Sequence, residues 1–322
     1  CCLTTTESLE TIRREWGCSR VYGVTDLETY VACPLRFYFA RLLRLKVDRK
    51  IWGELDPADL GVMIHDILAR FYRKRLENGN AGFARGDIGR CREEMQEACE
   101  QVFAEMPSVF EGLHPVAMLA EKKFIFSWME QLLEREADYF DENKFRPEFL
   151  EVDFGYARDG RQPPFPPLHL GEGEDAFRVG GRIDRIDVDR SGHQPVFRII
   201  DYKSGERKAA LKNLETGRDL QLPLYLKAVA ESILPGCAIR DGIFYSLREL
   251  DFSHYRLNRG PLAGEAWDLY LAIACEKAAE AVKGIRSGDF PAGECVRREY
   301  CDYLSLCRGG RENREEAPDA DS

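Results

Sequence analysis

Two charged runs in the middle of the chain determine its fold, Gly181-Arg182-Ile183-Asp184-Arg185-Ile186-Asp187 and Ile200-Asp201-Tyr202-Lys203-Ser204-Gly205. They lie in alternating apolar segments, 177–189 and 196–203, with the turn residues Ser191 and Gly192 between them. This pattern predicts two strands that can pair as a hairpin. Because side chains alternate between the faces of a strand, Asp201 and Lys203 share a face. Asp184 on the neighbouring strand can approach them.

The residue types at this point suit phosphodiester cleavage. Asp184 and Asp201 offer hard oxygen ligands for Mg²⁺ or Mn²⁺, which polarise a phosphate and lower the pKa of a bound water. Lys203 can orient or deprotonate that water and offset the charge that develops. The alternative is an ordinary ion pair between Asp201 and Lys203 on an edge strand, and for a bare acid-x-lysine triplet that alternative is the better interpretation.

Helical patterns flank this hairpin on both sides. We expect helices over 25–46, 59–77, 87–106, 116–143, 219–234 and 264–287, and further strands over 151–156 and 239–247. Thr25 is the expected N-cap of the first helix, with Glu28 three residues on as in a capping box. The predicted fold class is therefore α/β, a small central mixed β-sheet flanked by helices with a helical N-terminal part.

Composition limits the class of protein. The chain has 322 residues, of which 44% are hydrophobic, and no apolar run long enough to span a membrane. It begins at Cys1 without a signal peptide, so we expect a cytoplasmic fragment of a longer protein. A net charge of −10 argues against nucleic-acid binding. Five acids in the tail 311–322 account for part of it, and local basic patches matter more than the sum.

Taken together, the motifs resemble, in order and spacing, the RecB-type nucleases of the PD-(D/E)XK superfamily, which include the nuclease domains of the RecBCD and AddAB helicase–nucleases. The resemblance extends from about Val24 to Arg308 and rests on the runs 24–28, 32–38, 61–68, 181–187, 201–203 and 221–225. It implies a restriction-endonuclease-like core over 21–309, with a helical part to 145, the catalytic sheet over 146–250 and a C-terminal helix and cysteine-rich end. Residues 1–20 are expected to be a linker and 310–322 a disordered acidic tail.

The resemblance also implies roles for individual residues. The metal is expected on His65, Asp184, Asp201 and the carbonyl of Tyr202, with Lys203 as the water-activating group. Gln221 and Tyr225, one helical turn apart, are expected to touch DNA or orient Lys203. From composition alone, His65 is more simply a structural histidine, and the Gln221–Tyr225 pair an amphipathic helix surface.

Eleven cysteines, an odd number, argue against a secreted disulfide scaffold and favour reduced thiols or metal thiolates. An early cysteine with a C-terminal trio resembles the iron–sulfur members of the family, which implies a 4Fe–4S cluster on Cys33, Cys295, Cys301 and Cys307. The family spacing places a cysteine where this chain has Arg298, so the cluster pattern is incomplete unless Cys295 replaces it. From the residues alone, zinc is equally suitable.

Basic residues that can line a DNA channel are Arg36, Arg41, Arg44, Lys46, Arg182, Arg185, Arg207, Lys208 and Lys212. No base-reading motif is present, so backbone recognition is expected. The predicted function is an Mg²⁺-dependent DNA nuclease, an exonuclease on single-stranded or unwound ends in double-strand-break repair, with a helicase domain or subunit as its partner. The alternative is a non-catalytic domain of the same fold that binds DNA ends or scaffolds a subunit.

Overall fold

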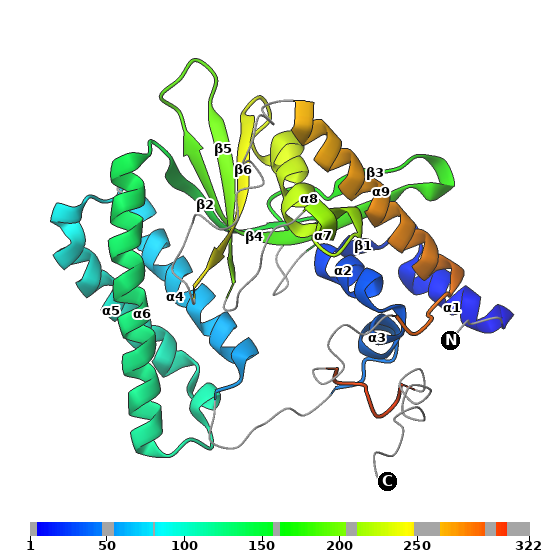
Figure 1. The fold of residues 1–322 in the computed structure, drawn as a ribbon, viewed down its shortest axis with the longest axis horizontal. Coiled ribbons are helices and arrows are strands. Elements are labelled where there is room, and N and C mark those ends of the chain that lie inside the picture. Colours follow the sequence, from blue (N-terminus) through cyan, green and yellow to red (C-terminus); the bar gives the residue numbers. More distant parts are fainter. Residues whose placement is uncertain are drawn as a thin grey trace, which may run out of the picture.

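The structure, a computed structural model, describes residues 5–46, 55–79, 81–156, 162–203, 211–247, 265–293 and 301–307. The strands in these ranges form a mixed sheet, which lies between two groups of helices (Figure 1). The helices are α1 Thr6–Trp16, α2 Val24–Ala32, α3 Pro34–Phe37, α4 Pro57–Glu77, α5 Ile88–Glu105, α6 Pro115–Glu142, α7 Leu211–Glu215, α8 Gln221–Ala228 and α9 Glu265–Ser287. The strands are β1 Val21–Gly23, β2 Arg146–Phe154, β3 Leu168–Leu170, β4 Phe177–Asp189, β5 Val196–Lys203 and β6 Ala238–Ser246.

The long strand β4 organises the sheet. Its first half pairs with β1 in parallel and with β3 in antiparallel orientation, and its second half lies between antiparallel β2 and β5. Strand β6 then extends the sheet in parallel with β5. The predicted hairpin is confirmed at both strands, 177–189 and 196–203. The three-residue strands β1 and β3 were not predicted, because they are too short to show a period-two pattern.

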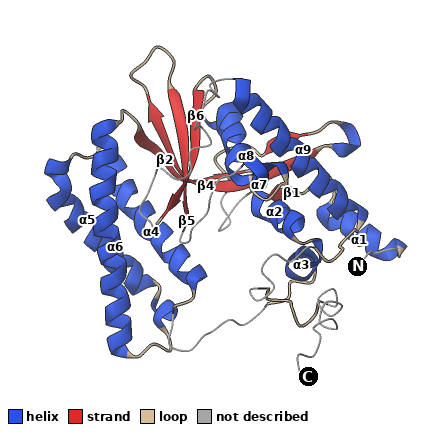
Figure 2. Cartoon of the chain, in the orientation of Figure 1, coloured by secondary structure: helices blue, strands red, loops and turns tan. Residues whose placement is uncertain are grey.

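The two helical groups cover different parts of the sheet (Figure 2). Helices α4, α5 and α6 pack on one another, and α4 contacts β2. Helices α1, α2, α7 and α8 pack around α9, while α8 also contacts β5 and β6. The predicted mixed α/β class is therefore confirmed. No helix in the described part of the chain combines the length and apolarity that a membrane span needs.

A buried ionic network lies between the sheet and the first helical group. Arg185 is fully buried and donates to both carboxylate oxygens of Asp187, at 2.6 and 2.7 Å. It also donates to Glu136 of α6 at 2.8 Å and to the Tyr202 hydroxyl at 2.9 Å. Tyr72 of α4 bonds to the same Glu136 carboxylate. The expectation that Arg185 lines a DNA channel was wrong, because alternation turns it to the face opposite Asp184 and into the core.

The predicted helix over 25–46 is broken at Cys33. Helix α2 ends there because Cys33 is extended, with φ −163° and ψ 104°, and Pro34 starts the short helix α3. The residue before a proline avoids the helical region, which explains the break. A π-helical turn, Tyr38–Leu42, follows α3. Gly23 and not Thr25 is the N-cap of α2, so the expected capping box is absent.

The expected linker over 1–20 instead contains helix α1. Thr5 caps it by accepting from the Ser8 amide at 3.3 Å. Ile12 and Trp16 are only 3% and 2% exposed, and Arg20 lies over the Trp16 ring. The helix was missed because these two apolar residues are the buried ones of eleven, too few for a clear stripe. The tail 310–322 lies outside the described residues.

If α1 is part of the folded domain, Trp16→Ala will lower the free energy of unfolding by about 3–5 kcal/mol, the usual loss for a buried aromatic side chain. Urea denaturation measures this difference. Arg14→Ala is the control, because Arg14 lies on the same helix with its side chain 74% exposed, and it is expected to cost less than ~0.5 kcal/mol. Equal, small losses in the two variants would contradict the packing of α1.

Candidate active site

An open cleft of about 740 Å³ lies between the two helical groups, beside the sheet. Helix α4 contributes one wall, β2 and β4 the floor, and the starts of α2 and α8 the opposite wall. His65, Asp184, Tyr202, Lys203, Gln221 and Tyr225, all predicted from the sequence, line this cleft. The folding of the chain therefore brings together residues from separate motifs.

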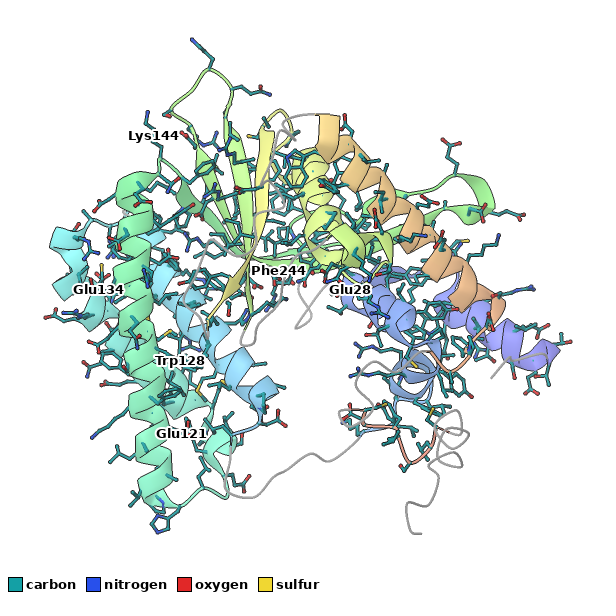
Figure 3. All side chains as sticks on the ribbon, in the orientation of Figure 1. Glu28, Glu121, Trp128, Glu134, Lys144 and Phe244 are labelled. Carbon is teal, nitrogen blue, oxygen red and sulfur yellow. The ribbon has the colours of Figure 1, made fainter. Side chains whose placement is uncertain are left out.

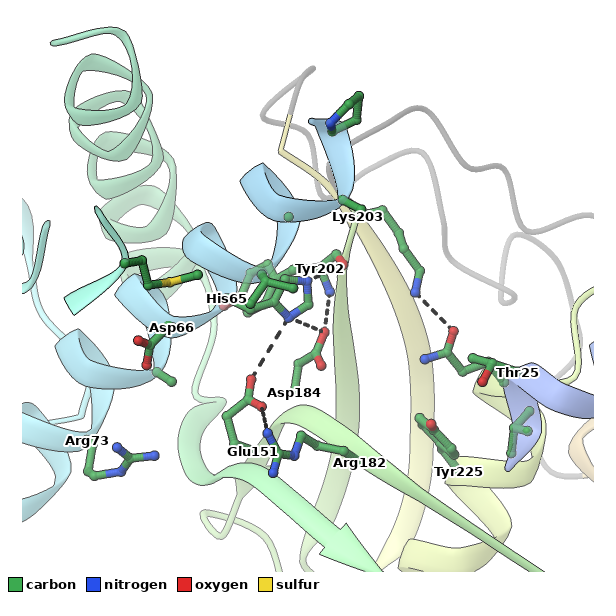
Figure 4. A pocket seen from close by; sticks show the side chains of 18 of the residues that line it. Thr25, His65, Asp66, Arg73, Glu151, Arg182, Asp184, Tyr202, Lys203 and Tyr225 are labelled. Carbon is green, nitrogen blue, oxygen red and sulfur yellow. Dashed lines mark hydrogen bonds and ion pairs between the residues drawn. The ribbon is translucent and has the colours of Figure 1, made fainter. Parts of the chain in front are cut away.

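Three side chains converge on one point in the cleft: His65 of α4, Glu151 of β2 and Asp184 of β4 (Figure 4). Their ligand atoms all lie within 4.8 Å of one another, with His65 Nδ1 3.4 Å from Asp184 Oδ2. Among the described residues, the histidine, cysteine and acidic side chains that lie close enough together to hold a metal ion are these three. An imidazole with carboxylate oxygens suits a divalent cation such as Mg²⁺ or Mn²⁺.

The backbone of Tyr202 contacts two members of this group. Its amide donates to Asp184 Oδ2 at 2.8 Å, and its carbonyl oxygen lies 3.0 Å from His65 Nε2. The carbonyl therefore lies at the Nε2 edge of the His65 ring, whereas Nδ1 faces Asp184 and Glu151, and its role as a metal ligand stays a prediction. The Tyr202 side chain leaves in the opposite direction, to the Arg185 guanidinium in the core.

Asp201 and Lys203 lie beside this group and form an ion pair. Gln221 bridges them: its Oε1 accepts from Lys203 Nζ at 3.0 Å and its Nε2 donates to Asp201. Asp201 is thus directed at Lys203 and Gln221 here, and not into the group of His65, Glu151 and Asp184. The strand that carries Asp201 and Lys203 lies between β4 and β6, which excludes an ion pair on an edge strand.

Tyr225 is 4% exposed and packs over β4 at Gly181. A Cβ atom on Gly181 would lie 2.5 Å from the Tyr225 hydroxyl, so this glycine leaves the space that the ring occupies. The ring also meets Phe154 edge-on, with centroids 5.5 Å apart. Tyr225 therefore holds α8 against the sheet and presents only a small surface to the cleft.

Glu151 was missed in the sequence. It lies within β2 with φ +47°, a left-handed backbone conformation that non-glycine residues seldom adopt and that recurs at functional sites. Its partners in the cleft are His65 Nδ1 at 4.0 Å and Arg182. The available signal was weak: one of three acids in a largely half-buried strand, with no motif around it.

The acids of the site shift the protonation of their neighbours. Burial lowers the pKa of His65, but the hydrogen bond and charge of Asp184, with Asp201 and Glu151, outweigh burial and raise it to about 9. Burial, with the charge of Asp184, raises the pKa of Glu151 to about 7. Burial raises the pKa of Asp201 to about 6, against the opposing effect of Lys203. Such clustered shifts are typical of functional sites and of sites that lack a balancing cation.

The cysteine-rich end lies against the segment that follows Cys33. Tyr303 donates to the Leu45 carbonyl at 2.9 Å, and Arg36 lies 3.8 Å from Asp302. Cys33 Sγ accepts from the amides of Arg36 and Gly293, both at 3.4 Å. Cys33, Cys301 and Cys307 are half-buried free thiols, and Cys295 and Arg298 lie outside the described residues.

Comparison with known proteins identifies the class of protein to which this fold belongs. The chain belongs to the PD-(D/E)XK nuclease superfamily, whose family model matches residues 22–308. Similar proteins include subunits of the ATP-dependent helicase/deoxyribonuclease from three bacteria. That of Ruminiclostridium cellulolyticum is 31% identical over 73% of this chain, that of Caldanaerobacter subterraneus 29% over 73%, and that of Moorella thermoacetica 32% over 65%. The matches cover 20%, 20% and 18% of those proteins, so the chain spans about a fifth of their length.

If Glu151 is a metal ligand, Glu151→Gln will remove the stabilisation that Mn²⁺ gives the protein. A cation at a hundredfold excess over its Kd stabilises the folded state by about 2.7 kcal/mol, which a thermal melt detects as a higher Tm. The control is Glu148→Gln on the same strand, because Glu148 pairs with Arg190 and does not line the cleft. An undiminished Mn²⁺ shift in Glu151→Gln would exclude Glu151 from the site.

Proposed function

We propose that this domain is a metal-dependent deoxyribonuclease that hydrolyses the phosphodiester backbone. The observation that carries the proposal is the convergence of His65, Glu151 and Asp184 on one point, next to the Lys203–Asp201 pair and the Tyr202 carbonyl. These residues would hold Mg²⁺ or Mn²⁺, with Asp201 turning from Lys203 as a further ligand. The donor set fits the ion, because it combines carboxylate and carbonyl oxygens with one imidazole.

The bound ion would polarise the phosphate and lower the pKa of a water molecule. The chain supplies the other parts of the reaction. Lys203 Nζ, held by Gln221, would orient the attacking water and offset the negative charge that develops at phosphorus. Arg182, which lines the cleft beside Glu151, would hold a phosphate oxygen. No step requires a contact to a base edge, so sequence preference is expected to be slight.

We infer a single-stranded or unwound DNA end as the substrate, cut as an exonuclease, and a helicase domain or subunit that supplies it. The support is the name of the relatives, helicase/deoxyribonuclease. This chain matches about a fifth of their length. Repair of double-strand breaks is the process that such an activity would serve. The alternative, a DNA-end-binding or scaffolding domain without catalysis, predicts binding without cleavage.

Removing the lysine tests catalysis directly. With end-labelled single-stranded DNA and Mg²⁺ or Mn²⁺, Lys203→Ala is expected to lower kcat by about 10²-fold or more. Lys74→Ala is the matched control, because Lys74 pairs with Glu97 outside the cleft and its loss leaves the site intact. Cleavage by Lys203→Ala at the wild-type rate would refute the assignment. Metal binding without cleavage in the wild type would favour the binding domain.

We further propose that Cys33, Cys295, Cys301 and Cys307 hold a 4Fe–4S cluster. The two amides that donate to Cys33 Sγ support this, since such bonds stabilise a thiolate, and the packing of 301–307 against Leu45 brings the ends of the domain together. A cluster would link Cys33 to Cys307 and so close a loop that contains most of the chain. Cross-links that close long loops reduce the freedom of the unfolded state the most.

Iron and acid-labile sulfide, measured in protein purified without oxygen, test the cluster. Cys33→Ser is expected to lose both, with a lower Tm, because one of four thiolate ligands is gone. Cys237→Ser serves as control, since Cys237 is another half-buried free thiol outside this set. Zinc in place of iron in the wild type, or full iron content in Cys33→Ser, would overturn the cluster assignment.

A further inference from the structure

Helix α8 begins without a cap of its own. Its N-cap position is Leu220, whose apolar side chain makes no capping hydrogen bond. The first amides of a helix have no partner within the helix and carry a partial positive charge. Pro223 lacks an amide hydrogen and so removes one unpaired donor from this turn. The amides of Leu220, Gln221 and Leu222 remain, and the first two find an acceptor elsewhere in the chain.

That acceptor is Glu28, which lies 192 residues earlier in the chain than Leu220. Glu28 Oε1 accepts from the Leu220 amide at 2.8 Å and from the Gln221 amide at 3.0 Å. Figure 3 places Glu28 on α2, where this helix approaches α8. Helix α2 is itself fixed, because Leu27 is buried and Tyr30 donates to the Asp289 carbonyl at 2.7 Å. A carboxylate from one helix thus caps another.

The residue capped in this way is the one that holds the lysine. Gln221 is 6% exposed, and its side-chain amide contacts both Lys203 and Asp201. Its backbone amide is bonded to Glu28, so displacement of the carboxylate moves the first residue of α8 and with it the bridge to Lys203. The metal-binding group of His65, Glu151 and Asp184, in contrast, is carried by α4, β2 and β4.

We propose that Glu28 is a positioning residue for catalysis, which sets the place of Lys203 through the N-terminus of α8 and Gln221. This inference rests on the proposed role of Lys203 in DNA cleavage. It gives a function to an acid of the first motif that the metal site leaves unused. It also separates the active site into two parts: the group of His65, Glu151 and Asp184, carried by α4, β2 and β4, and the Asp201–Lys203 pair, held through Gln221 by α8 and, through it, by α2.

Glu28→Ala and Glu28→Gln, made in the whole 322-residue chain, test this separation. Glu28→Ala is expected to lower kcat on single-stranded DNA by roughly tenfold or more, since small displacements of a catalytic group cost this much. Its KM and its Mn²⁺-induced rise in Tm should stay near the wild-type values. Glu28→Gln keeps an oxygen acceptor for the two amides and should recover most of the kcat.

Asp26→Asn is the matched control, because Asp26 lies on the same helix and pairs with Arg41 instead of α8. It is expected to lower the Tm without changing kcat. Wild-type kcat in Glu28→Ala, alongside an inactive Lys203→Ala, would overturn the positioning role and leave the nuclease proposal standing. Parallel loss of kcat, Mn²⁺ response and Tm would also overturn it, since that outcome shows a merely structural role. A wild type without cleavage would remove both proposals together.

Discussion

The buried guanidinium of Arg185 is the interaction on which the rest of the structure depends. A fully buried charge is tolerated only where partners surround it, and Asp187, Glu136 and the Tyr202 hydroxyl do so. These partners belong to β4, α6 and β5, so the sheet and the first helical group are held in one arrangement. Tyr202 connects this network to the cleft on the other face of the sheet, because its hydroxyl contacts Arg185 while its backbone contacts both Asp184 and His65.

Much of the candidate site could be predicted because its residues lie in regular elements. Alternation along β5 places Asp201 and Lys203 together, and pairing with β4 brings Asp184 within reach, both of which follow from the period of a strand. His65 and Gln221 were placed by resemblance to a family, since their contacts join helices and strands that are distant in sequence. No local pattern reports such contacts.

The failures have physical causes of their own. Glu151 escaped prediction because a left-handed residue inside a strand has no sequence signature when the residue is not glycine. Helix α1 was overlooked because two buried side chains, Ile12 and Trp16, fix an otherwise polar segment. The break at Cys33 was predictable from Pro34, but the apolar residues on either side suggested one continuous helix. In each case a tertiary contact or a single backbone angle outweighed the local pattern.

The parallel pairing of β1 with β4 has a consequence for the order in which the protein forms. Gly23 lies beside Gly180, and the second half of β4 cannot present Asp184 to Lys203 until β5 has been added after it. During synthesis the ribosome therefore releases the first strand long before its partner exists. Contacts so far apart in sequence form late and slowly. A growing chain thus cannot assemble the cleft until Lys203 and Gln221, well past the middle of the sequence, have been synthesised.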